Sequence, residues 1–254
     1  MKQYVCENVF VPLRLMPSHR SEMLSQVVFG ERYVIIDEIP GWIKVELEFD
    51  GYRGWMDKSH LQHSVAGQAG NSYVLNRNLA CFRPDNTVMV IEAGSEIYEP
   101  DFERKSFRAG ENTYTVKGEF TEKYISVSES VTDTALRFLN SPYLWGGRVP
   151  SGIDCSGFTQ LVYKIHGIRI PRDSFKQAEA GEPVEFISDA RAGDLVFFDN
   201  ELGKITHVGM ILSEGLVIHA SGRVRIDVID HQGIFRREAG NYSHHLRLIR
   251  RIIS

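Results

Sequence analysis

The chain has 254 residues, of which 43% are hydrophobic and 24% charged. This is the composition of an average soluble protein, and it excludes disordered, fibrous and coiled-coil chains. At roughly 100–200 residues per domain, the length allows one to three domains with a sizeable core. The formal net charge is −4, from 29 basic and 33 acidic side chains. A protein held on nucleic acid by non-specific charge is therefore not expected.

The N-terminus and the cysteines bear on the compartment. No apolar run approaches the roughly 18–20 residues of a membrane span, and the segment after Met1 lacks the apolar stretch of a secretory signal. We therefore expect a cytoplasmic protein, or an exported one if a signal was trimmed. Cys6, Cys81 and Cys155 are too few for a disulfide framework, which fits a reducing compartment. Cys6 and Cys81 lie in strand-like runs and are expected to be small buried hydrophobes.

The first 65 residues are rich in short strand-like segments. Turn residues separate these segments at short intervals, for example at Pro40–Gly41 and Asp50–Gly51. Many short strands with regular turns predict a small barrel or sandwich over residues 1–65. The small and polar residues 65–72 are typical of a linker. The predicted strands lie at 9–14, 26–31, 33–38, 42–48 and 51–56.

The rest of the chain divides into two further parts. Weaker strand patterns at 87–91, 95–98 and 113–117 predict a second small β-domain over residues 66–128. Beyond residue 129, helical spacing at 132–139 and after Asp154 precedes a series of strand-like runs. Helices followed by consecutive strands predict an α+β domain with an antiparallel sheet over residues 129–254. Its predicted strands lie at 195–198, 205–212, 216–219, 226–229 and 246–252.

Cys155 stands at the start of the second of these helices. Asp154 before it is a good N-cap, and Gly167 is a good helix stop. Unpaired N–H groups and the helix dipole at such a position stabilise a thiolate. The glycine-rich turns before it could present the sulfur at a surface. The alternative is that Cys155 is a small buried hydrophobe, and the helix start alone makes the two interpretations equal.

Two histidines lie in apolar strand-like runs, His207 within 205–210 and His219 within 216–220. A lone histidine in such a run is more often a satisfied core residue, but two are less easily explained that way. A hairpin turn at 213–215 would pair residue 212 with 216 and residue 209 with 219. His207 would then share a face with His219, within reach of its ring, whereas a slip of one residue would separate them.

Together these side chains fit nucleophilic catalysis. The Cys155 thiolate would attack a carbonyl, His207 would take up and return the proton, and His219 would orient His207 through a hydrogen bond between the rings. Backbone N–H groups at the helix start could stabilise the oxyanion. A zinc site built on the same residues is the competing interpretation. Because the remaining histidines lack the spacing of a fourth ligand, we expect neither a metal nor a cofactor.

Six segments keep their order over nearly all of residues 130–254: Tyr143–Gly147, Asp154–Phe158, Arg172–Ser174 with Gln177, Ala192–Phe198, Thr206–Met210 and Ile218–Ala220. Together they resemble the NlpC/P60 family of papain-like cysteine peptidases. The resemblance implies a papain-like fold with Cys155 as nucleophile, His207 as base and His219 as the third member. The strand-rich N-terminal part of the chain resembles bacterial SH3 (SH3b) domains, which implies SH3b-like domains at 1–65 and 66–128 before the peptidase domain.

This arrangement is similar to that of γ-D-glutamyl-L-diamino acid endopeptidases, which cleave murein peptides with a free N-terminal L-Ala. The resemblance implies murein peptides as partners and a role in recycling cell-wall peptides. Carried over by position, Asp173 would bind the L-Ala ammonium and Ser174 would assist. A carboxylate suits this task, because a buried ammonium without a partner is costly. The alternative for Asp173 is an ordinary helix N-cap, and both can hold at once.

The resemblance assigns five more residues to substrate binding. The ordinary alternatives are core packing for Trp145, a helix cap for Asp154 and strand packing for Tyr52. Arg148 could meet the α-carboxylate of D-Glu, although a surface arginine is the simpler interpretation. The assigned residues are Trp145, Asp154 and Ser156 in the cleft, with Glu22 and Tyr52 from the first SH3b domain.

Two other functions compete with this endopeptidase. A broader hydrolase or amidase would use its SH3b domains to bind intact peptidoglycan. A binding module would carry a degenerate peptidase domain, although the intact set of Cys155, His207 and His219 argues against that. In principle, a thioester on the same nucleophile could also be captured by an amine, as in an acyltransferase.

Overall fold

The computed structural model describes residues 2–61 and 71–253. These residues divide into two compact units. Unit 1 is residues 1–128 together with 146–149, and unit 2 is residues 129–145 together with 150–254. Most of the predicted linker at 65–72 lies outside the described residues. No helix among the described residues is long and apolar enough to cross a membrane.

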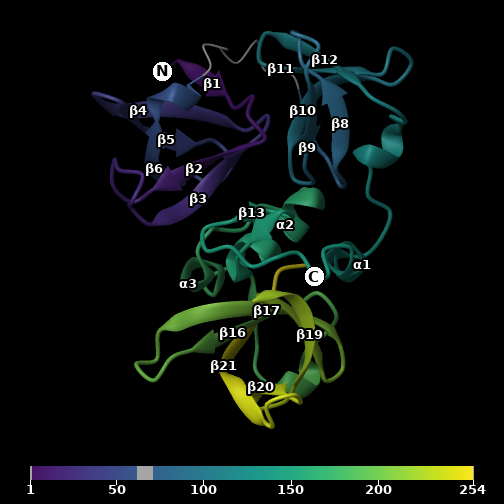
Figure 1. Ribbon diagram of the computed structural model, residues 1–254. Coiled ribbons are helices and arrows are strands. Elements are labelled where there is room, and N and C mark those ends of the chain that lie inside the picture. The colour runs from purple at the N-terminus through teal and green to yellow at the C-terminus, as the bar shows by residue number, and fades with distance from the viewer. Residues whose placement is uncertain (1, 62–70, 254) are drawn as a thin grey trace. The chain divides into compact units, whose positions relative to one another are not determined.

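Unit 1 begins with an antiparallel sheet of strand order β1-β4-β5-β6-β2-β3 (Figure 1). The five predicted strands are found within a few residues of their predicted positions, whereas β1, only three residues long, was missed. Ile43, Val45 and Leu47 alternate inward along β5, as predicted from their spacing. A 3₁₀ turn follows at Lys58–His60. The strands are β1 (Gln3–Val5), β2 (Phe10–Arg14), β3 (Met23–Val28), β4 (Arg32–Ile39), β5 (Trp42–Leu47) and β6 (Arg53–Asp57).

The second part of unit 1 repeats this topology. Its strand order is β7-β10-β11-β12-β8-β9, the order of the first sheet shifted by six strands. A 3₁₀ turn closes the segment at Glu122–Tyr124. The weaker periodicity of this region hid β7, β8 and β11 from sequence reasoning. The strands are β7 (Ser72–Val74), β8 (Leu79–Phe82), β9 (Val88–Ile91), β10 (Glu96–Asp101), β11 (Ser106–Ala109) and β12 (Asn112–Val116).

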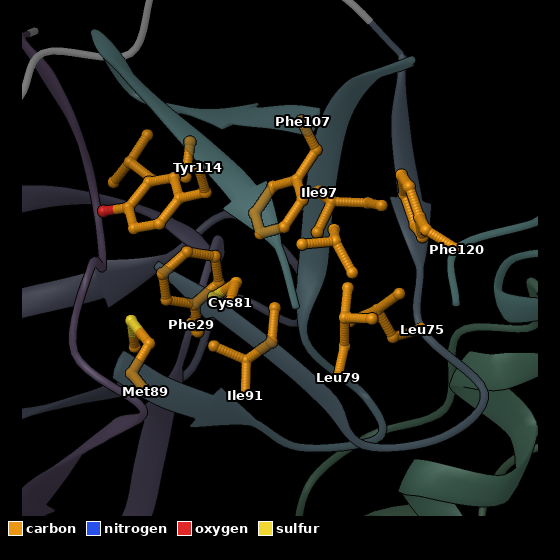
Figure 2. Close-up of a cluster of buried hydrophobic side chains, with 13 residues drawn as sticks. Phe29, Leu75, Leu79, Cys81, Met89, Ile91, Ile97, Phe107, Tyr114 and Phe120 are labelled. Carbon is orange, nitrogen blue, oxygen red and sulfur yellow. The ribbon is translucent and has the colours of Figure 1, made fainter. Parts of the chain in front are cut away.

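The two sheets of unit 1 share a hydrophobic core. Phe29, which follows β3, packs edge-on against Phe107 and Tyr114, with ring centres 6.2 and 5.2 Å away (Figure 2). Beside it, the buried carboxylate of Glu7 accepts a hydrogen bond of 2.6 Å from the Tyr114 hydroxyl and one of 2.7 Å from the Asn112 amide. Aromatic packing and the hydrogen bonds to Glu7 therefore join the two sheets.

The segment 146–149 belongs to unit 1 although it lies far along the chain. Arg148, in β13 (Arg148–Val149), is buried and forms a two-pronged ion pair with Glu31, both bonds 2.8 Å long. Its backbone N–H also donates to the side chain of Gln26 over 2.7 Å. The prediction of a surface arginine is therefore wrong. A fully buried guanidinium needs such a partner, because leaving it unpaired would be costly.

Unit 2 contains three helices within the described residues: α1 (Val131–Leu136), α2 (Cys155–Ile165) and α3 (Ser174–Gln177). Helix α1 ends earlier than the predicted 132–139, because the chain tightens after Leu136: the N–H groups of Phe138 and Leu139 bond to the carbonyls three residues before them. Ser130 caps the helix at its start. The predicted start and stop of α2 are both found.

The sheet of unit 2 has strand order β15-β21-β16-β17-β18-β19-β20, and β20 also pairs with β21, which closes the sheet on itself (Figure 1). The predicted antiparallel sheet is found, but its extent makes the α+β description only partly right, because strands dominate the short helices. The strands are β14 (Gly152–Ile153), β15 (Glu182–Val184), β16 (Leu195–Asp199), β17 (Ile205–Ser213), β18 (Leu216–Ser221), β19 (Arg223–Ile229), β20 (Gly233–Arg236) and β21 (Asn241–Arg251), with a 3₁₀ turn at Ile187–Asp189.

The register of β17 and β18 agrees with the sequence prediction at the pair that positions the two histidines. Gly209 pairs with His219, as predicted. The turn itself differs, since Ser213 rather than residue 212 pairs with Leu216, and an irregularity after Ile211 absorbs the extra residue. His207 and His219 therefore lie on the same face of the closed sheet, the face that also carries the apolar cluster of Ile211, Val217 and Ile229.

Candidate active site

Cys155 is the first residue of α2, directly after its N-cap. The Asp154 carboxylate accepts a hydrogen bond of 2.7 Å from the backbone N–H of Gly157, so the cap is the one predicted. The sulfur is not presented at a surface, because Cys155 is only 6% exposed. Its position at the helix start is right, and its predicted exposure is wrong.

Burial also decides the protonation state of Cys155. Removal from water raises the pKa of the thiol to about 12, and the negative charge of Asp154 adds to this rise. Hydrogen bonds from the backbone N–H groups of Val208 and Ser156 and the charge of Arg172 lower it, but by less. The expectation of a resting thiolate is therefore corrected to a resting thiol. The helix start cannot compensate for the lost hydration of the charge.

The backbone N–H of Val208, the residue after His207 in β17, acts on the Cys155 sulfur. A chain of hydrogen bonds links His207 to His219, Asp227 and Arg225. Nε2 of His207 lies 2.8 Å from Nδ1 of His219, and Nε2 of His219 lies 2.9 Å from a carboxylate oxygen of Asp227. Asp227 in turn accepts from Arg225 over 2.8 Å. His207, His219 and Asp227 are all less than 9% exposed.

The direction of each hydrogen bond follows from the carboxylate at the end. An ionised carboxylate only accepts, so Nε2 of His219 carries a proton and donates it to Asp227. Nδ1 of the neutral His219 ring is then an acceptor, and the proton between the rings belongs to Nε2 of His207. This leaves Nδ1 of His207 with a free lone pair. The Asp227 carboxylate thus sets the tautomer of His207, the proposed base, through the ring of His219.

The electrostatic environment supports these protonation states. Burial, the charges of His219 and His244, and Arg236 hold the pKa of His207 well below its ordinary value. Burial also lowers the pKa of His219, against the opposing effect of Asp227. Burial would raise the pKa of Asp227, but hydrogen bonds from His219 and Arg225 bring it below its ordinary value. Both rings are therefore neutral near pH 7 and Asp227 is ionised.

Sequence reasoning missed Asp227 and His244. Asp227 is an acid inside the apolar run 226–229, and this isolated charge was the available signal. The ring of His244, in β21, stacks on His207 with ring centres 4.2 Å apart and planes 26° apart. Burial lowers the pKa of His244 to about 4. A neutral ring thus packs against one face of His207 and restricts its rotation.

Asp154 and Ser156 are held by Arg172. The guanidinium donates to both carboxylate oxygens of Asp154 over 3.0 and 2.6 Å, and to the Ser156 hydroxyl over 2.8 Å. The Gln177 amide donates to the backbone carbonyl of Ser156 over 3.0 Å. All four side chains are buried. These contacts fix the first turn of α2, and contact of Asp154 or Ser156 with substrate stays a prediction.

Asp173, Ser174 and Trp145 are the other residues of unit 2 that were predicted to bind substrate. Asp173 is the N-cap residue of α3, yet its side chain makes no capping hydrogen bond. The carboxylate lies 3.5 Å from Lys176, and Ser174 opens the helix. Capping therefore does not occupy the Asp173 carboxylate. Trp145 is 57% exposed, so the alternative of core packing is wrong.

Glu22 and Tyr52 belong to unit 1. Glu22 is exposed and directly precedes β3, and its carbonyl accepts a hydrogen bond from Leu15. Tyr52 precedes β6, is partly buried and packs against the first hydrophobic core. Its backbone N–H donates to Asp50. The role of both residues in substrate binding stays a prediction.

Metal binding was the competing interpretation of this site. Within residues 2–61 and 71–253, no group of three or more histidine, cysteine or acidic side chains is arranged to hold a metal ion. His166 lies 2.9 Å from the Thr134 hydroxyl instead. The hydrogen bond between the rings of His207 and His219 also uses nitrogen atoms that a metal would need.

Comparison with known proteins identifies the family of the chain. Residues 140–241 match the NlpC/P60 family, and residues 13–61 match the bacterial dipeptidyl-peptidase Sh3 domain. The γ-D-glutamyl-L-lysine dipeptidyl-peptidase of Bacillus subtilis (strain 168) is 33% identical over 218 residues, which cover 77% of this chain and 71% of that protein. The chain belongs to the NlpC/P60 family. As a member, it is a peptidase with an SH3 domain before its peptidase domain.

Two further relatives of this NlpC/P60 protein extend over most of its length. The protein of the same name from Bacillus cereus (strain ATCC 10987 / NRS 248) is 27% identical over 256 residues, covering 89% of this chain and 77% of that protein. A crystal structure of an NlpC/P60 family protein from Bacillus cereus ATCC 10987 superposes with a TM-score of 0.83 at 21% identity, over 100% of both chains. This structure supports the fold.

Proposed function

We propose that this NlpC/P60 protein is a cysteine endopeptidase that cleaves the bond between γ-D-Glu and a diamino acid in murein peptides with a free N-terminal L-Ala. The observation that carries the proposal is the chain of hydrogen bonds from His207 through His219 to Asp227, together with the backbone N–H of Val208, the residue after His207, which acts on the Cys155 sulfur. The names of the relatives supply the bond, because two of them are γ-D-glutamyl-L-lysine dipeptidyl-peptidases. The role in recycling cell-wall peptides and the cytoplasmic location belong to the same proposal.

Acylation begins with the thiol. The free lone pair on Nδ1 of His207 accepts the proton of Cys155 as the sulfur attacks the γ-carbonyl carbon of D-Glu. The His207 imidazolium that forms is stabilised through His219 by the negative charge of Asp227. Backbone N–H groups at the start of α2 receive the oxyanion. When the tetrahedral intermediate collapses, Nδ1 returns the proton to the leaving amine and a thioester remains.

Deacylation uses the same groups in reverse. Nδ1 of His207, now neutral again, takes a proton from water as its oxygen attacks the thioester carbon. The C–S bond then breaks, the sulfur recovers the proton, and L-Ala-D-Glu leaves. Because the resting pair is a neutral thiol and a neutral imidazole, the proton moves during attack rather than before it. This differs from an enzyme that rests as a thiolate–imidazolium pair.

Selection of the substrate amine falls to Asp173. Its carboxylate makes no capping hydrogen bond and lies 3.5 Å from the partly exposed ammonium of Lys176. A substrate ammonium could replace that lysine at little cost, because exposed ion pairs contribute little. In this proposal Ser174 assists Asp173, and Glu22 and Tyr52 contribute from the SH3-like part.

The first test is mass spectrometry of L-Ala-γ-D-Glu-diaminopimelate, and of the L-Lys peptide, incubated with wild type and with Cys155→Ala. Release of L-Ala-D-Glu by the wild type alone would establish the bond and the nucleophile. An N-acetylated peptide tests the free amine, and unchanged turnover would refute that part. If neither these peptides nor intact sacculi are cleaved, the endopeptidase proposal is wrong.

A further inference from the structure

A buried ion pair flanks the nucleophile at the start of α2. Asp154 directly precedes Cys155, and Ser156 directly follows it. The Arg172 guanidinium donates to the two carboxylate oxygens of Asp154 over 3.0 and 2.6 Å, and to the Ser156 hydroxyl over 2.8 Å. The side chains of Arg172 and Asp154 are only 2% and 8% exposed. One guanidinium therefore holds the residues on both sides of the sulfur, away from water.

The donors around the Asp154 carboxylate all favour its charged form. Besides Arg172, the carboxylate accepts from the backbone N–H of Gly157 over 2.7 Å, the bond that caps α2. Hydrogen bonds of this kind stabilise an ionised carboxylate. Without the guanidinium, a buried negative charge would therefore lie one residue from the sulfur. It would oppose both the thiolate and the oxyanion, which carry negative charge during the attack.

Two opposite charges act on the Cys155 sulfur, a negative one from Asp154 and a positive one from Arg172. The other titratable side chains that bear on the nucleophile are His207, the proposed base, and Tyr143. Burial, and after it the charge of Cys155, raises the pKa of Tyr143, while burial holds the pKa of His207 well below its ordinary value. Both are therefore neutral near pH 7, and the balance of charge at the sulfur depends on Arg172.

We propose that Arg172 is a positioning residue for the nucleophile: it balances the charge of Asp154 and fixes the turn around Cys155, so that the attacking sulfur meets no opposing carboxylate charge. This inference rests on the proposed function, because it concerns the charge that develops during acylation. Arg172 acts through Asp154 and Ser156. The planar fork of an arginine suits this task, since a lysine would offer only a point charge.

Alkylation of Cys155 by iodoacetamide, followed by mass spectrometry at several pH values near neutrality, tests this charge balance without a substrate. Arg172→Met leaves the Asp154 charge unopposed and should slow alkylation by at least about threefold. A nearby charge shifts a pKa by about one pH unit, which lowers the thiolate fraction tenfold, and the greater nucleophilicity of the more basic thiolate offsets part of this loss.

The opposite change should have the opposite effect. Asp154→Asn removes the negative charge, keeps a good capping residue and should accelerate alkylation by a similar factor. The double variant Arg172→Met/Asp154→Asn should return to within about twofold of wild type, because neither charge remains. Arg169→Met is the matched control, since it removes the same charge from an exposed arginine of the same segment, and it should leave the alkylation rate unchanged.

Steady-state kinetics on L-Ala-γ-D-Glu-L-Lys test the consequence for the reaction. Arg172→Met should lower kcat by about tenfold with little change in KM, and Arg172→Lys should keep part of the rate because it retains the charge. If wild type does not cleave the peptide, the proposed function fails, whereas the alkylation rates still decide whether Arg172 balances Asp154.

The proposal is overturned if Arg172→Met and Asp154→Asn change the alkylation rate in the same direction, or if the double variant departs from wild type as far as the single ones. Either result would mean that the ion pair only stabilises the fold. If Arg172→Met does not fold, Asp154→Asn and the double variant decide. Slower or unchanged alkylation of Asp154→Asn would then refute the proposal.

Discussion

Replacing Asp227 by Asn tests the proton order at the centre of the site. The substitution keeps the shape of the side chain and removes its charge. Arg225 and His219 both donate to Asp227, and an amide offers a single acceptor atom for these donors. In one orientation the amide would donate to Nε2 of His219. The His219 proton would then lie on Nδ1 and be donated to Nε2 of His207. The proton of His207 would therefore lie on Nδ1, which would have no lone pair left for the thiol.

The size of the effect follows from the distances. The ring centres of His207 and His219 are 5.0 Å apart, and the hydrogen bond from His219 to Asp227 is 2.9 Å. With the ring radius added, the carboxylate lies roughly 9 Å from His207, where unit charges interact by about 2 kcal/mol at an effective dielectric constant of about 20. Loss of this stabilisation of the imidazolium should lower kcat by about 30-fold. KM should change little, because Asp227 does not face the substrate.

Steady-state kinetics on the murein tripeptide over a range of pH would measure both effects. His207 and His219 share a hydrogen bond and titrate as a pair, and Asp227 raises the pKa of His219. Removal of Asp227 should therefore move the acid limb of the pair to lower pH. A purely structural role would lower activity without that movement. Asp230→Asn is the control, since Asp230 bonds to the Tyr242 hydroxyl and contacts neither ring. If Asp227→Asn keeps kcat within about threefold of wild type, the tautomer argument is wrong.

Three more predictions follow from the same geometry. Because the pKa of His207 is lowered, kcat/KM should still be high at pH 6.5 and should fall only in more acidic solution. An acid limb with its midpoint above pH 6.5 would contradict the neutral resting base. Because burial raises the pKa of Cys155, iodoacetamide should alkylate it at pH 7 more slowly than a free thiol, as mass spectrometry would measure, and faster alkylation would indicate a resting thiolate. Arg148→Ala should lower the free energy of unfolding by about 3–5 kcal/mol, because it removes the guanidinium from the buried Glu31 carboxylate, and denaturant titration showing less than about 1 kcal/mol would refute this.

The parts of the site that depend on local sequence could be predicted. The cap at Asp154 and the start of α2 follow from neighbouring residues. The pairing of Gly209 with His219 follows from one short turn, and it holds although the turn contains an irregularity. The strand pattern of the first 65 residues was equally local. Short strands such as β1 carry too few residues to show a period.

The parts that depend on tertiary structure could not be predicted. The place of Asp227 depends on the register of β18 and β19, which sequence alone did not give. The raised pKa of Cys155 depends on its burial, whereas the helix start favours the opposite shift. The partner of Arg148 lies 117 residues away in the chain, beyond the reach of any local pattern.

The pairing of Arg148 with Glu31 limits how this protein can be divided or recombined. A peptidase fragment that begins near residue 129 would keep Arg148 and lose both Glu31 and Gln26, which it contacts. Such a fragment would carry, shortly before its nucleophile, a guanidinium that has lost these partners. A chimaera with a foreign N-terminal barrel must therefore bring an equivalent acid, or replace residues 146–149 at the same time. Gain, loss or exchange of the first barrel would accordingly require compensating changes at these two places in the chain.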